Sequence, residues 1–184
     1  MRFTVTSAEL IEVYGLGHIT YFPDQRSTGV DSRAGAFLAS VGLPESVVFA
    51  ARRDVEDPYG PEVDAITLGS RFEHYGIPCP EESRQWWALG YLFTSLLAVD
   101  PASGRVYAFP EGALGHIELH RDIESLVFAL IELRKVEIDH DNGVSPEELA
   151  ARFRDTVGRF DPTAFADEES QWNLAMEELE HGIW

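Results

Sequence analysis

The sequence predicts an α+β fold, in which a central, mainly antiparallel β-meander is flanked by helices near both ends of the chain. Two changes in hydrophobic period support this prediction: helical spacing gives way to short β-prone runs over about 47–119 and returns after Leu119. Helical and extended segments do not alternate as βαβ units, which argues against a doubly wound parallel sheet. A length of 184 residues is typical of one domain, so we expect a single domain over 1–184.

Two helices and a short strand are expected before the meander. Thr6 opens a capping-box pattern and Gly15 follows the last apolar position, which predicts a short helix between them. The β-prone run 19–23 ends at a proline, as a short strand does. Asp31 is a suitable cap for a second helix that ends at Gly42. The apolar face of that helix consists of Ala34, Phe37, Leu38 and Val41.

Short β-prone runs predict the strands of the meander, and most are separated by turn-forming residues. They cover residues 47–51, 65–69, 87–91, 92–99, 105–109 and 113–119. Asp100 to Gly104 has its proline early and its glycine late, which is typical of a hairpin turn. Hairpins join antiparallel neighbours, so an antiparallel meander follows.

Three helices are expected after the meander. Apolar residues with a period of 3.6 predict a helix over 123–136 that covers one face of the sheet. Ser145 is then a cap with Pro146 at the first helical position, which predicts a second helix. A last helix is expected over about 167–181, with Gly182 as its stop.

The net charge is the strongest signal in the composition. The chain has 32 acidic and 14 basic residues, a formal net charge of −18 that is spread along its length. Phosphate contacts require lysine and arginine, so direct nucleic-acid binding is disfavoured and a basic partner is favoured. The alternative is that the acidity serves solubility alone.

Cysteine content and hydropathy point to a cytoplasmic protein. Cys79 is the only cysteine, so no internal disulfide requires an oxidising compartment; its position between two prolines indicates a structural loop thiol. Residues 1–7 lack the apolar run of a secretory signal, and no apolar stretch approaches the roughly 20 residues of a membrane span. We therefore expect no membrane association.

Two segments have metal-ligand patterns, each with a simpler alternative. In a strand, His116, Glu118 and His120 share one face and match a zinc site; they equally match a solvated face opposite a core of Ile117 and Leu119. Residues 137–148 place acidic residues at calcium-loop positions but lack the required glycine, which favours an acidic loop between helices. We expect no metal ion and no cofactor. The sequence also lacks nucleophile-elbow, phosphate-loop and dinucleotide motifs, so we expect no enzyme.

Seven residues are candidates for binding a partner. A loop rich in proline and glycine presents five carboxylates around one tyrosine, and Trp86 precedes the most apolar run of the chain. Exposed loops and aromatic anchors are favoured at interfaces, although a solvated connection is the alternative for the loop. Because neighbouring strand residues face opposite sides, one ring of the pair Trp86 and Trp87 belongs to the core and the other can reach the surface. The candidates are Asp54, Glu56, Asp57, Tyr59, Glu62, Asp64 and Trp86.

Several segments occur in a recognisable order: 21–23, 35–44, 66–69, the hairpin 97–107, and Leu119 leading into a helix. Their order and spacing resemble the SUKH superfamily, in particular its fourth subfamily of immunity proteins found beside bacterial polymorphic toxins. The resemblance covers roughly 16–136 and is weaker at Gln171 and Trp172. It implies one SUKH-like domain over 1–184, an α+β fold with a central sheet, a cleft that binds a cognate toxin, and no catalytic residues.

The function expected from the charge and the resemblance is that of an immunity protein. Such a protein binds and neutralises a cognate toxin domain, and a basic toxin acting on nucleic acid, a nuclease or a deaminase, suits the acidic surface. The alternative is a non-enzymatic regulatory or scaffold module that binds a cellular protein.

Overall fold

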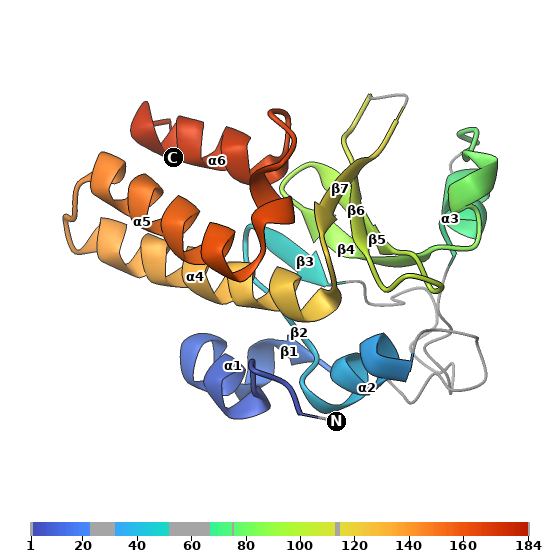
Figure 1. Ribbon diagram of the computed structural model, residues 1–184, viewed down its shortest axis with the longest axis horizontal. Coiled ribbons are helices and arrows are strands. Elements are labelled where there is room, and N and C mark those ends of the chain that lie inside the picture. The colour runs from blue at the N-terminus through green and yellow to red at the C-terminus, as the bar shows by residue number, and fades with distance from the viewer. Residues whose placement is uncertain (1, 23–31, 52–66, 75, 113–114, 184) are drawn as a thin grey trace.

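The computed structural model describes residues 2–22, 32–51, 67–74, 76–112 and 115–183 (Figure 1). Its main sheet has five strands in the order β3-β4-β5-β6-β7, and every neighbouring pair is antiparallel. The predicted α+β fold with a central meander is therefore confirmed. The strands are β3 (Phe49–Ala51), β4 (Trp87–Leu92), β5 (Ser95–Val99), β6 (Val106–Phe109) and β7 (Ile117–His120); β1 (Ile19–Thr20) and β2 (Leu43–Pro44) form a separate antiparallel pair.

The helices lie on both sides of the main sheet (Figure 1). The first pair is α1 (Ser7–Tyr14) and α2 (Ser32–Ser40), and the C-terminal group is α4 (Ile123–Asp141), α5 (Pro146–Phe160) and α6 (Gln171–Glu180). These five pack with the inner face of the sheet, whereas α3 (Leu68–His74) packs against the opposite, outer face. Short 3₁₀ helices are η1 (Leu16–His18), η2 (Glu81–Ser83) and η3 (Pro162–Phe165). None of the described helices is both long and apolar enough to cross a membrane.

Both faces of the sheet are apolar, because alternate strand residues enter two different clusters. On β5, Leu97 and Val99 belong to the large inner core with α4, while Leu96 and Ala98 belong to a smaller cluster with α3. The uninterrupted apolar runs of the central strands follow from this arrangement, because in a sheet covered on both sides neither set of alternating side chains faces water.

Side-chain caps start the helices where the sequence predicts them. Thr6 Oγ1 accepts from the Glu9 N–H at 3.2 Å at the start of α1, and Ser145 Oγ accepts from the Glu148 N–H at 3.3 Å at the start of α5. The predicted cap Asp31 lies outside the described residues.

The predicted strand over 65–69 is wrong in its described part. Only Thr67 bridges to Trp87, and α3 begins at the next residue. The Thr67 hydroxyl accepts from the Ser70 N–H at 3.3 Å, which caps the helix. Leu68 and Phe72, one helical turn apart, then pack on the outer face of the sheet. The β-prone composition was overridden by this cap and this packing.

The acidic segment after Val136 is helical, which corrects the prediction of a loop over 137–148. Helix α4 continues to Asp141 because ion pairs hold its last turns: Glu137 with Arg134 at 2.7 Å, and Asp139 with Arg152 on α5. The turn between the two helices is confined to 142–145. A calcium loop over this segment is therefore ruled out. Helix α6 starts later than expected, after a Ser170 cap.

Gly90 on β4 occupies a position that no other residue fits without strain. Its φ is +152°, and an added Cβ would lie 2.2 Å from the Ala50 carbonyl oxygen on β3. The pairing of β4 with β5 shifts between Ala88 and Gly90, as at a β-bulge. The glycine thus lets β3 approach the bulged strand closely.

Candidate functional site

A cluster of aromatic rings covers part of the outer sheet face. Trp86 and Tyr107 are stacked with ring centroids 4.2 Å apart. The His116 ring stands beside them, 5.0 Å from Trp86, 5.2 Å from Tyr107 and 5.3 Å from Phe109. Tyr107 and Phe109 lie on β6, whereas Trp86 and His116 lie just before β4 and β7, and antiparallel pairing of the strands brings the rings side by side.

A hollow of about 890 Å³ adjoins this cluster between α3 and the strands. Its walls are mostly apolar: Phe72 and Ile77 come from the α3 side, and Tyr91, Leu96 and Phe109 come from the sheet. The rest of the lining is Arg71, Pro78, Cys79, Pro80, Thr94, Pro110, Glu111, Gly112 and Gly115. Its size lies within the range of about 300–1,000 Å³ that is typical of ligand sites.

The rim of the hollow combines exposed apolar and acidic side chains. Ile77, which lines the hollow, is 54% exposed, so the apolar surface of the hollow continues to its edge. Glu111 lines the hollow and is exposed, as are Glu81 and Glu82 of the neighbouring η2. The Arg71 guanidinium lies over the Tyr91 ring, 5.7 Å from its centroid. The site is thus an apolar surface with an acidic border.

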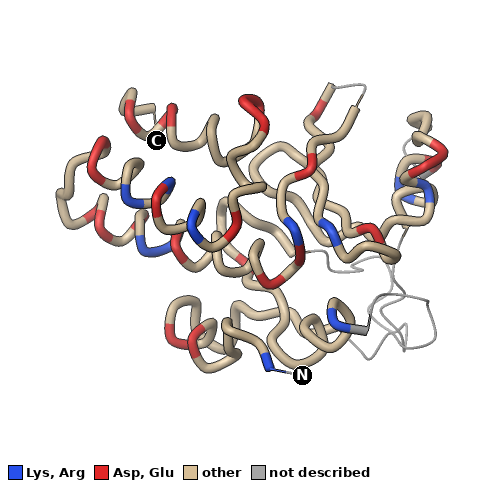
Figure 2. The backbone as a smooth tube through the Cα atoms, viewed as in Figure 1, with Lys and Arg blue, Asp and Glu red and all other residues tan. Residues whose placement is uncertain are grey.

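Acidic residues are also distributed over the rest of the molecule. Figure 2 shows them on α1, on the C-terminal helices, on β7 and on α3, with basic residues interspersed. Arginines and lysines of the C-terminal helices are largely engaged in pairs, such as Arg154 with Glu180 and Lys135 with Glu132. The excess of negative charge therefore has no confined location.

The seven predicted partner-binding residues meet different outcomes. Asp54, Glu56, Asp57, Tyr59, Glu62 and Asp64 lie outside the described residues, so their role stays a prediction. Trp86 lies half-buried in the aromatic cluster, while Trp87 is 6% exposed within the inner core. The two rings thus face opposite sides of the sheet, as the strand period predicts.

His120 contradicts the prediction of a solvated polar face on β7. Its side chain is fully buried, with Nδ1 3.0 Å from Asp161 Oδ2 and Nε2 accepting from the Trp172 indole N–H at 2.8 Å. Pairing between β6 and β7 shifts by one residue beside Val106, so strict alternation of side chains ends there. His116, in contrast, contacts the outer aromatic rings, and Glu118 pairs with Arg105.

The predicted zinc pattern therefore does not converge on one point. Its three residues face a ring cluster, an arginine and a buried carboxylate. Among the residues that the structure describes, no group of three or more histidine, cysteine, aspartate or glutamate side chains is placed to hold a metal ion.

The hydrogen bonds of His120 define its protonation state. An indole N–H only donates, so Nε2 must accept and the proton of the neutral ring resides on Nδ1, from which it is donated to Asp161. Burial lowers the pKa of His120, against the opposing effect of Asp161. The ring is neutral and both of its nitrogens are occupied, so it lacks the free nitrogen that a general base requires.

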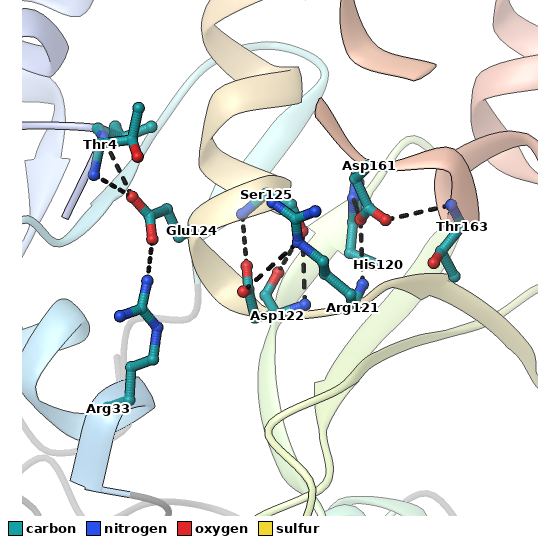
Figure 3. Close-up of polar contacts among 10 residues, drawn as sticks. Thr4, Arg33, His120, Arg121, Asp122, Glu124, Ser125, Asp161 and Thr163 are labelled. Atoms are coloured by element: carbon teal, nitrogen blue, oxygen red, sulfur yellow. Dashed lines mark hydrogen bonds and ion pairs between the residues drawn. The ribbon is translucent and has the colours of Figure 1, made fainter. Parts of the chain in front are cut away.

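Asp161 holds three segments together (Figure 3). Besides His120, it accepts from the Arg121 N–H at 3.0 Å and from the Thr163 N–H at 3.1 Å. Burial by itself raises the pKa of this carboxyl group, but the hydrogen bonds from His120 and Arg121 outweigh it and the pKa is lowered. The carboxylate thereby fixes the end of α5 against the junction of β7 and α4.

Glu124 performs a similar task at the N-terminus (Figure 3). Its carboxylate is 6% exposed and accepts from the backbone N–H groups of Thr4 and Val5 and from the Arg33 guanidinium of α2. A buried carboxylate with three donors is well satisfied. It ties the first residues and α2 to the start of α4, and it is a structural clamp.

Sequence reasoning missed the hollow, because the start of α3 was assigned to a strand over 65–69 and the rest of α3 and Ile77 to no element. One signal for it was present: Tyr91, Leu96 and Phe109 alternate with inner-core residues. When both sets of alternating residues in a strand are apolar, other parts of the protein or a partner are expected to cover both faces of the sheet.

Comparison with known proteins gives a match to a family model. The family model described as SUKH-4 immunity protein matches residues 5–178, which is nearly the whole chain. Neither the curated proteins nor the solved structures contain a match.

Proposed function

Because the chain belongs to the SUKH-4 immunity protein family, we propose that it binds a toxin domain through its folded surface and neutralises that domain stoichiometrically. The match over residues 5–178 is the observation that carries this proposal, since it includes the inner core, the outer sheet face and α3. The family implies a toxin partner. The site, mechanism and toxin class are inferred from the chemistry of the chain.

Neutralisation by binding, without catalysis, is supported by the state of the reactive side chains. The histidine that resembles half of a catalytic pair, His120, is buried with both nitrogens engaged. Burial raises the pKa of the Cys79 thiol, which keeps it in the less reactive protonated form. Both groups are therefore poorly suited to turnover.

A basic toxin domain that acts on nucleic acid, a nuclease or a deaminase, is the partner that the charge favours. Such a domain needs positive charge to hold phosphate, and a net charge of −18 attracts it from a distance. The same charge disfavours direct contact of this chain with nucleic acid. The absence of a second cysteine supports action in the cytoplasm, where such a toxin finds its substrate.

The test is a binding measurement with the toxin domain encoded beside this chain. We expect a one-to-one complex by calorimetry, loss of toxin activity at equimolar ratio, and slower association as salt is raised from 50 to 500 mM. A control protein of similar size and net charge should leave the toxin active. The proposal is wrong if the toxin stays active when this chain is in excess.

A further inference from the structure

The outer sheet face has an apolar surface larger than this chain's own elements cover in the described residues. Phe72, Tyr91 and Phe109 line the hollow, yet Ile77 at its rim remains 54% exposed. Ile77 and the apolar walls of the hollow form one contiguous surface, and contiguous exposed apolar surface, unlike scattered single residues, marks interaction sites. Such an arrangement is typical of a surface that becomes covered on binding.

We propose that this hollow is the docking site for a segment of the toxin domain that carries large apolar side chains flanked by lysine or arginine. The inference rests on the proposed function and names the contact surface for it. A volume of about 890 Å³ is near the upper end of the range for ligand sites, so it accommodates more than one side chain. The apolar walls provide affinity, in the manner of interface hot spots.

The acidic border explains the basic flanks of that segment. Glu111 lies in the lining, and Glu81 and Glu82 are exposed on η2. Arg71, the cation in the lining, lies over the Tyr91 ring. A second copy of this chain is a poorer occupant, because it brings the same charge of −18 to an already acidic rim.

The aromatic cluster extends the docking site along the sheet. Phe109 contacts both sides: its centroid lies 6.0 Å from Phe72 in the hollow and 6.1 Å from Trp86 in the cluster. Trp86 is half-buried and packs against Phe109, which itself lines the hollow. A segment seated in the hollow therefore reaches Trp86, which is one of the predicted partner-binding residues.

The test compares two large aliphatic residues of similar exposure, one at the hollow and one far from it in the sequence. Ile77→Glu adds a charge at the hollow, whereas Leu174→Glu adds the same charge at a residue of α6 that is 44% exposed. The probe is the toxin domain encoded beside this chain, and affinity is measured at 300 mM salt to screen the added charge. We expect Ile77→Glu to weaken binding at least tenfold, about 1.4 kcal/mol, and Leu174→Glu to change it less than twofold.

A second variant tests the hollow by filling it. Thr94 lines the hollow from the exposed turn between β4 and β5, so Thr94→Trp narrows the hollow without adding charge. We expect at least a tenfold loss here too, with unfolding midpoints of both hollow variants close to wild type. If the wild-type chain binds the toxin and both hollow variants bind it equally well, the docking site is wrong and the proposed function stands. If the wild-type chain does not bind the toxin, the proposed function itself is refuted. If the chain instead associates with itself in the absence of toxin and Ile77→Glu abolishes this association, the hollow binds a second copy of the chain.

Discussion

Replacing Asp161 by alanine tests the most connected polar group of the structure. The substitution removes the acceptor of three hydrogen bonds, from His120 Nδ1, the Arg121 N–H and the Thr163 N–H. The His120 ring is fully buried, so no water replaces its partner, and an unsatisfied buried donor costs about 1–3 kcal/mol. Arg121 and Thr163 are less enclosed and lose less. We therefore expect the free energy of unfolding to fall by about 2–5 kcal/mol.

The assay is urea unfolding followed by circular dichroism at pH 7.5. With a slope of about 2 kcal/mol/M, the expected loss lowers the midpoint by roughly 1–2.5 M. Asp161→Asn keeps one acceptor oxygen and should lose about half as much. Asp155→Ala on the same helix is the control: Asp155 is exposed and pairs with Arg159, so its loss should stay within about 0.5 kcal/mol. An Asp161→Ala variant as stable as this control would refute the assigned role.

Three further substitutions and one property of the whole chain provide additional tests. Because the folded-state pKa of His120 is below its usual 6.5, the unfolded state binds more protons as the pH falls. The free energy of unfolding should therefore decrease below pH 6.5 by up to about 1.4 kcal/mol per pH unit. In His120→Asn this decrease should be absent when urea midpoints are measured as a function of pH. Glu124→Gln should lower the free energy of unfolding by about 1–3 kcal/mol and speed hydrogen exchange at the Val5 amide. Unchanged exchange would show that the clamp is unimportant. Gly90→Ala should cost about 1–3 kcal/mol in thermal unfolding, because its Cβ meets the Ala50 carbonyl oxygen; a neutral effect would mean that β3 moves freely. If the chain is a single domain, as we propose, fluorescence and circular dichroism should report the same unfolding transition, and separate transitions would indicate two units.

Local chemistry explains which elements were predictable. Thr6 and Ser145 cap helices through bonds to residues three positions ahead, so their role is contained in a few consecutive residues. The hairpin from Asp100 to Gly104 is local in the same way, with the Gly104 N–H donating to the Asp100 carbonyl at 2.8 Å. The period of 3.6 along α4 identified its buried stripe for the same reason.

Long-range contacts explain the errors. Leu68 was assigned to a strand because its neighbours are β-prone, whereas its burial against β4 and β5 favours a helix. The end of α4 was placed at Val136 because acidic residues follow, yet Arg152, on the next helix, pairs with one of them. Neither the strands that cover Leu68 nor Arg152 can be identified from residues close in the sequence. Secondary-structure propensity is a weaker effect than tertiary packing, so the distant contacts decide these two elements.

The sequence by itself determined that this chain forms an antiparallel meander between helices, that its surface is strongly acidic, and that it resembles a family of immunity proteins. Only the tertiary structure decided that His120 is buried between Asp161 and Trp172, residues 41 and 52 positions away, and that α3 leaves a hollow on the outer sheet face. The physical reason is that hydrophobic period records which side of an element avoids water. It does not record which distant element covers that side, or how completely.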